Sequence, residues 1–161
     1  LISKINTKSI LLNKLGKIHI YTYKNKLENN VNFAITKGRL SPDKSIPVRV
    51  LSTKIKNTNI LKNIEVKKIL KMLSKYKNFL LLIINNINKT NNNSINTLRY
   101  YGFGAQIIKD LKVKNMILIS RRKKKIIALE GFGLKIKKQI IVKWKKFLLS
   151  ILIIIKIYQM T

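Results

Sequence analysis

Two glycine-containing motifs on either side of an apolar run constrain the fold of this chain more than any other feature. The first motif spans residues 101–106, the second spans 129–134, and the apolar run lies at 116–119. Glycines beside aromatic residues predict a tight turn leading into a helix over about 105–111. The apolar run predicts a buried strand, and the second motif predicts a turn into another strand. This stretch therefore alternates helix and strand, as α/β domains do.

The rest of the chain supplies elements that fit the same class. Alternation and turn residues predict strands over 16–24, 31–38 and 47–51, the last beginning at Pro47. A period near 3.6 predicts a helix over 63–76 with Asn63 as its N-cap. The remaining expectations are a central strand at 79–84, a polar loop at 85–96, a short helix at 124–129 stopped at Gly131 and a last strand at 134–142. Together they predict an α/β fold, a single domain with a mixed β-sheet flanked by helices.

We expect a domain over residues 1–143 and an apolar and basic C-terminal tail over 144–161. The tail contains the apolar run 147–155, which is too short to span a bilayer as a helix. A core element and an interfacial membrane segment both remain open for it, but no membrane partner is expected. With no signal-peptide pattern at the start, the cytoplasm is the expected location. A start at Leu1 rather than Met suggests a piece of a longer protein.

Positive charge dominates the composition, with 35 Lys and Arg against 5 Asp and Glu and a formal net charge of +30. Such an excess is typical of proteins that neutralise phosphates. However, Lys, Ile and Asn are abundant everywhere in the chain, and an A/T-rich genome raises all three together. We therefore interpret the charge mainly as compositional drift and do not expect nucleic acid as the partner. Self-repulsion of like charges follows from it in either case.

Side chains that bind metals are scarce. The chain has no cysteine, which excludes disulfides and thiolate metal sites. His19 is the only histidine, and the five acidic residues are dispersed along the sequence. No metal ligand set and no pair of catalytic carboxylates is predicted from these residues.

In sequence, the two motifs resemble the GTP cyclohydrolase II family. The order Leu-Arg, Tyr-Gly-x-Gly-Ala-Gln and Leu-Glu-Gly-x-Gly-Leu over 98–134 carries the resemblance, which extends with gaps over roughly 14–142. The resemblance implies the family's mixed α/β fold and a place in riboflavin biosynthesis. It also implies the family's reaction, in which a zinc enzyme converts GTP to a diaminopyrimidine ribosyl phosphate and formate.

The family's zinc ligands have no counterparts here. Active members carry Arg-Val-His-Ser-Glu-Cys after their third strand, and residues 49–54 stand at that place. Arg49 and Ser52 match the family, but Lys54 replaces the first cysteine, and no Cys-x-Cys follows in 56–67. A protonated lysine has no lone pair to offer a metal. We therefore expect no zinc and no other cofactor.

Two further family positions bear on catalysis and nucleotide binding. Active members carry Asp-x-Arg before the first glycine motif, and here Thr97 replaces the Asp while Arg99 is kept. Threonine cannot act as a general base near neutral pH. The resemblance makes Arg99 a vestigial catalytic candidate. It also implies nucleotide contacts from Arg49, Ser52, Ser120 and Lys125.

The pattern resembles degenerate cyclohydrolase-like domains fused behind 3,4-dihydroxy-2-butanone-4-phosphate synthase. We expect a pseudoenzyme domain that stabilises or dimerises such a synthase, with the synthase fused or associated, a homodimer, and at most weak GTP binding. One alternative is an active GTP cyclohydrolase II. Another, of a different class, is a basic RNA-binding or ribosomal protein.

Overall fold

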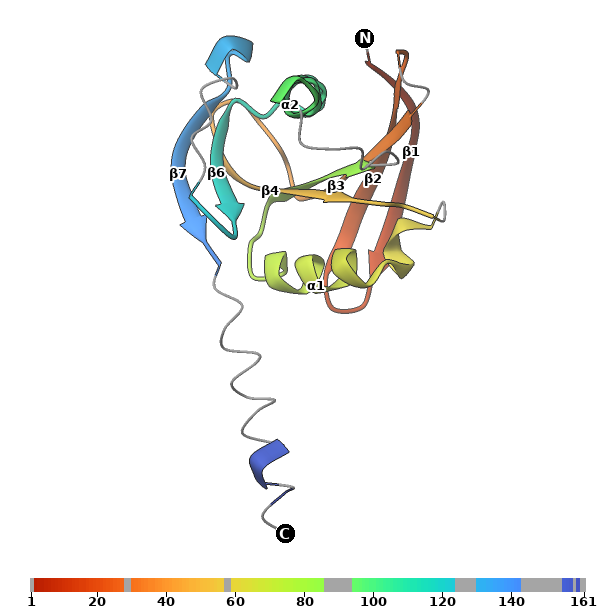
Figure 1. Ribbon diagram of the computed structural model, residues 1–161, viewed down its shortest axis with the longest axis vertical. Helices are drawn as coiled ribbons and strands as arrows, with labels where there is room; N and C mark the ends of the chain where they lie inside the picture. The colour runs from red at the N-terminus through yellow and green to blue at the C-terminus, as the bar shows by residue number, and fades with distance from the viewer. Residues whose placement is uncertain are drawn as a thin grey trace.

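The protein is described by a computed structural model over residues 2–27, 30–56, 59–85, 94–123, 130–142, 155–157 and 159. For residues 94–101 and Glu130, only the backbone is described. This part of the chain contains one mixed seven-stranded sheet with helices on its two faces (Figure 1). The expected α/β class and mixed sheet flanked by helices are therefore confirmed.

The sheet joins an antiparallel half to a parallel half. Its strands are β1 (Ile2–Leu12), β2 (Gly16–Asn25), β3 (Asn30–Lys37), β4 (Ser45–Thr53), β5 (Phe79–Asn85), β6 (Asn115–Ser120) and β7 (Lys135–Ile141). In space the order is β1-β2-β3-β5-β4-β6-β7, with β1, β2, β3 and β5 antiparallel in turn and β5, β4, β6 and β7 parallel. The helical elements are α1 (Ile64–Leu73), α2 (Ser94–Asp110) and the short 3₁₀ turns η1 (Ile60–Lys62) and η2 (Glu130–Phe132).

Most predicted elements are present close to their expected bounds. The predicted N-cap is confirmed, because the Asn63 side chain accepts a hydrogen bond from the Val66 backbone N–H at 3.1 Å. No strand is predicted over the residues of β1. Its residues 4–9 are all exposed, and this edge strand lacks the alternation that burial on one face produces.

The predicted turn at the first glycine motif is wrong, and so is the end of the predicted polar loop. α2 begins at Ser94 and runs through Gly102 and Gly104. A Cβ atom at Gly104 would lie 3.1 Å from Leu82 Cδ2, which is tighter than ordinary contact. The glycine therefore lets the helix approach β5 closely, which is a packing role rather than a turn.

The second motif also differs in detail. Gly131 lies within η2, and the left-handed residue before β7 is Gly133, with a φ of 75°. The short helix predicted at 124–129 lies outside the described residues. In the tail, residues 155–157 are helical and Ile155 and Ile157 are exposed. The boundary at residue 143 stays a prediction, and no helix in the described ranges is long and apolar enough to cross a membrane.

Two apolar layers hold the domain together, one on each face of the sheet. All seven residues of β5 are buried between them. On one face α1 contributes Val66, Ile69, Leu70 and Leu73; on the other α2 contributes Ala105, Ile107 and Ile108. Each fully buried Leu or Ile side chain stabilises the fold by about 1.5–3 kcal/mol. These two layers therefore make the main apolar contribution to the stability of the described fold.

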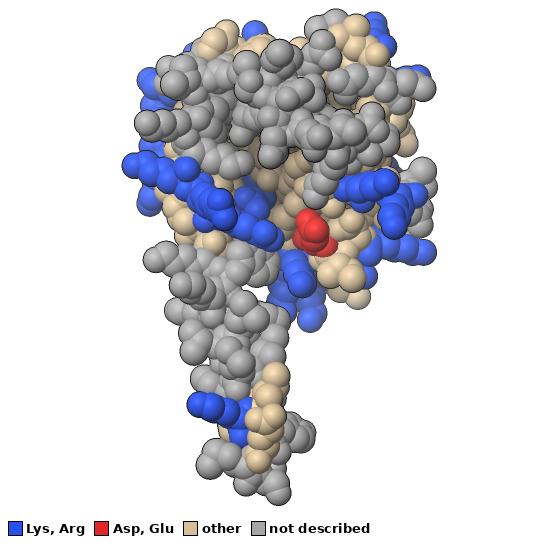
Figure 2. Space-filling model, viewed as in Figure 1, with Lys and Arg blue, Asp and Glu red and all other residues tan. Residues whose placement is uncertain are grey.

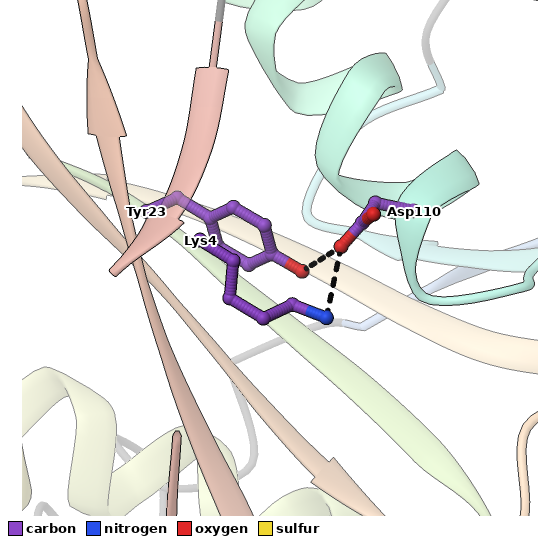
Figure 3. A network of polar contacts seen from close by, with 3 residues as sticks. All are labelled: Lys4, Tyr23 and Asp110. Atoms are coloured by element: carbon purple, nitrogen blue, oxygen red, sulfur yellow. Dashed lines mark hydrogen bonds and ion pairs between the residues drawn. The ribbon is translucent and has the colours of Figure 1, made fainter. Parts of the chain in front are cut away.

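A polar contact fastens the antiparallel half of the sheet to α2 (Figure 3). The Tyr23 hydroxyl donates to Asp110 Oδ2 at 2.7 Å, and Lys4 Nζ lies 3.0 Å from the same oxygen. Burial raises the pKa of Tyr23, and the neighbouring Asp110 carboxylate raises it further. Partial burial acts to raise the pKa of Asp110, but Tyr23 and Lys4 lower it more, so it lies below its ordinary value.

We expect Gly104→Val to destabilise the domain by about 1–3 kcal/mol, because the added methyl groups collide with Leu82 on β5. Gly102→Val on the same helix is the matched control, since its Cβ meets Phe132 at 3.8 Å, an ordinary contact. Urea unfolding of both variants measures the difference. Equal losses at the two positions would contradict the packing role of Gly104.

We expect Asp110→Asn to cost about 0.5–1 kcal/mol at neutral pH, a figure reduced for the partial exposure of this carboxylate. Because the folded pKa of Asp110 is depressed, its contribution is present above its ordinary value and lost as pH falls through the folded pKa. The stability difference between the wild type and Asp110→Asn should therefore shrink from about pH 5 to about pH 2. Urea unfolding at several pH values measures this stability difference, and a difference that does not change with pH would contradict the contact. In a Tyr23→Phe background, the stability lost through Asp110→Asn should be smaller.

Candidate functional site

The parallel strands end at one edge of the sheet, where α/β proteins bind ligands. β4 lies between β5 and β6. The chain passes from β4 to β5 on one side and then crosses to β6 on the other, so the topology switches between β4 and β6. Ligands of open α/β sheets bind at the carboxyl ends of strands at such a switch point.

Arg49 lies near this switch point on β4. Its Nη1 donates to the carbonyl oxygen of Ile119 on β6 at 3.2 Å, and the side chain is half-buried. Burial lowers the pKa of Arg49, and the nearby Arg121 lowers it further. Among the described residues, no carboxylate is found in an ion pair with Arg49. A partly desolvated cation of this kind favours an anion beside it.

The two serines implied by the family resemblance occupy the other face. Ser52 lies three residues beyond Arg49, and strand alternation places it on the α2 side, whereas Arg49 shares the α1 side with Leu51. Ser120 is buried, and its hydroxyl donates to the Arg122 carbonyl oxygen at 2.7 Å. Arg49, Ser52 and Ser120 therefore share one edge of the sheet but do not converge on one point.

The other two candidates are only partly placed. Arg99 lies in the first half of α2, whose N-terminus follows β5 at the same edge, and only its backbone is described. Thr97 lies on the same stretch of helix. Lys125 falls outside the described residues. Their roles at the site stay predictions.

The donors in the described part of the chain do not fit a zinc ion. Lys54 directly follows β4, at the position of the family's first cysteine, and its side chain is exposed. No three His, Cys, Asp or Glu side chains in the described ranges gather closely enough to hold a metal. The imidazole of His19 lies on β2, where its Nδ1 is 2.8 Å from Ser9 Oγ.

Sequence reasoning missed a buried asparagine network at this edge. Asn32 Oδ1 accepts from the Asn85 backbone N–H at 2.9 Å, and Asn30 Nδ2 donates to the Asn85 carbonyl at 2.6 Å. Asn85 Oδ1 in turn accepts from the Ile55 N–H at 2.9 Å. The network continues the β3–β5 ladder beyond its last backbone pair and holds the segment that follows β4. Asparagine is so common in this chain that only its alternation at 30 and 32 could have signalled it.

Comparison with protein families identifies the second half of the domain. Residues 67–141 match the family model of GTP cyclohydrolase II. Over this stretch the chain is similar to the GTP cyclohydrolase II family. The match runs from α1 to β7, so it includes the parallel strands β5 and β6 and both glycine motifs.

Curated relatives match a shorter segment. The riboflavin biosynthesis protein RibBA of Aquifex aeolicus (strain VF5) is 50% identical over 46 residues, which is 29% of this chain and 11% of the relative. RibBA of Bacillus subtilis (strain 168) is 51% identical over 43 residues, 27% of this chain and 11% of the relative. The aligned segments are thus a small part of those proteins.

A solved structure shares the fold of nearly the whole chain. The crystal structure of RibBX, a two domain 3,4-dihydroxy-2-butanone 4-phosphate synthase from A. baumannii, superposes with a TM-score of 0.59 and 21% identity. The match covers 88% of this chain and 40% of that one. The described strands and helices therefore share the fold of part of that longer protein.

We expect Asn85→Ala to destabilise the domain by about 1–3 kcal/mol, because it removes the acceptor of the Ile55 N–H from a buried side chain in a part-buried hydrogen bond. Asn115→Ala is the matched control, since Asn115 donates to the Pro42 carbonyl in an exposed setting. Thermal unfolding and hydrogen exchange at Ile55 measure the effect. Retained protection of Ile55 in Asn85→Ala would show that the network does not hold this segment.

Proposed function

We propose that this chain is a GTP cyclohydrolase II-like domain of riboflavin biosynthesis that does not catalyse zinc-dependent GTP hydrolysis. In this proposal it is a structural or dimerising domain of a fused or associated dihydroxybutanone phosphate synthase in the cytoplasm. The observation that carries the proposal is Lys54, an exposed cation at the family's first zinc-ligand position in a domain that keeps the family's fold.

The chemistry of the described residues supports the loss of hydrolysis. In the family, zinc supplies an activated water. Here the ammonium group of Lys54 repels a metal cation, and the chain has no cysteine to bind one. Thr97 cannot replace the missing carboxylate as a base. With neither metal nor base, no residue we can name generates a hydroxide nucleophile.

The relatives support the synthase partner. The curated matches are riboflavin biosynthesis proteins, and the solved neighbour is a two domain synthase of which this fold corresponds to 40%. A domain with an apolar core, and with no metal-binding cluster among its described residues, can still serve a neighbouring domain through its surface. The proposed contribution to the partner is therefore stability or dimerisation rather than chemistry.

Weak nucleotide binding is a further part of the proposal. Arg49 is half-buried without a described carboxylate partner, and Arg121 beside it adds like charge. A phosphate group near them would relieve this repulsion. Because Ser52 and Ser120 lie toward the other face, and Ser120 already donates to a backbone carbonyl, the site offers fewer convergent donors than a tight GTP pocket.

We expect the purified chain to hold less than about 0.1 equivalent of zinc and to release no formate from GTP when zinc is supplied, since thiolate ligands are absent. Elemental analysis and a coupled formate assay measure both quantities. Arg99→Ala is the control for contaminating enzyme. Formate release that depends on both Arg99 and zinc would overturn the proposal.

We expect a dihydroxybutanone phosphate synthase from the same genome to unfold at a higher temperature when this chain is present, because binding to the native state stabilises it. The synthase alone and the synthase with an unrelated basic protein are the controls. An unchanged unfolding temperature, together with separate elution in size exclusion, would contradict the scaffold role.

A further inference from the structure

The two outer edges of the sheet differ in charge. β7 carries three exposed lysines, Lys135, Lys137 and Lys138, within seven residues. On β1 the stretch from Asn6 to Leu12 carries one cation, Lys8. An unpaired strand edge is a template for another strand, and charged side chains on the edge suppress such pairing. The β1 edge is therefore much more open to pairing than the β7 edge.

The open part of β1 has definite limits. A register irregularity between Lys4 and Asn6 interrupts its pairing with β2, and from Asn6 to Leu12 the register is regular. Ile5 and Leu11 are exposed to 53% and 77% of their surface. A regular edge of seven residues with a largely exposed leucine leaves backbone groups unpaired with protein and apolar surface in contact with water in one copy of the chain.

We propose that the occupant of this edge is a second copy of the chain, paired antiparallel across β1 with Ser9 on the two-fold axis. This inference rests on the dimerising role proposed above and assigns its interface. Around Ser9 the strand is complementary to itself. Leu11 of one copy lies opposite Thr7 of the other, and Lys8 lies opposite Ile10, so no like charges directly oppose each other. A two-fold axis requires such a self-complementary strand, and the paired copies form one continuous sheet.

Side-chain direction supports this register. Thr7 and Ser9 pair with Tyr21 and His19 on β2, and these residues lie on the same face as Tyr23. By strand alternation, Leu11 lies on the α2 side together with Thr7 and Ser9. The Ser9 hydroxyl in this row contacts His19 Nδ1 on the neighbouring strand β2. In the dimer, this row meets its own copy and Leu11 is removed from water.

The salt dependence of association distinguishes a dimer through β1 from association held together by opposite charges. Each copy has a formal net charge of +30, so two copies repel each other. The Debye length falls from about 10 Å at 0.1 M salt to about 3 Å at 1 M. Dimerisation through β1 should therefore strengthen as salt rises, whereas association held together by opposite charges weakens.

The first test is sedimentation equilibrium of the full chain and of two variants that each add one positive charge. Leu11→Lys lies on the edge, and Leu27→Lys is the matched control because Leu27 is 68% exposed and outside any strand. We expect a wild-type dimer that tightens with salt, a dissociation constant raised at least about tenfold by Leu11→Lys, and no such change in Leu27→Lys.

The second test uses the absence of cysteine from the chain. Directly opposite residues of an antiparallel pair have Cα atoms about 4.5–5.5 Å apart, within the range that a disulfide spans. Ser9→Cys with diamide as oxidant should give a covalent dimer on a non-reducing gel, and Leu27→Cys should not.

The outcomes separate the interface from the role. A dimer that survives Leu11→Lys, and in which Ser9→Cys does not crosslink, would overturn the β1 interface while leaving the dimerising role intact. A wild-type chain that is monomeric at every salt concentration would overturn both. Equal weakening by the two lysine variants would show general repulsion and also overturn the interface.

Discussion

The burial of β5 on both faces is the constraint on which the rest of the structure depends. Its seven residues are all buried, so the sheet needs a covering layer on each side, and α1 and α2 provide them. Crossover connections run from β4 to β5 and from β5 to β6, and together they place β4 between its two parallel neighbours. The position of the carboxyl edge and of its switch point follows from this arrangement, whatever chemistry the edge retains.

The same layers separate fold from activity in this domain. Gly104 of the first glycine motif packs against Leu82 in the core. Packing constrains this position whatever ligand the domain binds. The Arg49 side chain donates to a backbone carbonyl of β6, and the Ser120 hydroxyl donates to the Arg122 carbonyl just beyond β6, whereas the Lys54 side chain is exposed. The position that matches a family zinc ligand is therefore exposed, whereas Gly104 lies in the packed interior. Packing in the core does not constrain the exposed basic residues. Figure 2 shows Lys and Arg side chains spread along both flanks of one face.

Much of the fold could be predicted because burial leaves a pattern in the sequence. The run at 79–84 and the face of α1 are apolar at the spacing their geometry requires, and Asn63 lies where a cap is needed. β1 could not be predicted, since an exposed edge strand is held by backbone pairing that polar residues support equally well. The site residues were found only through the family resemblance. Their separation onto two faces depends on strand alternation and a side-chain bond at Ser120, which no local pattern reveals.

We propose that the apolar core, and not a bound metal ion, supplies the stability of this domain. The most direct test of this proposal is thermal unfolding of the full chain in excess chelator and in about 100 µM zinc. A native metal site would raise stability by RT ln(1 + [L]/Kd), about 2.7 kcal/mol at one hundred times the dissociation constant. The account predicts the same midpoint in both solutions. A midpoint that rises with zinc and saturates at one equivalent would contradict it.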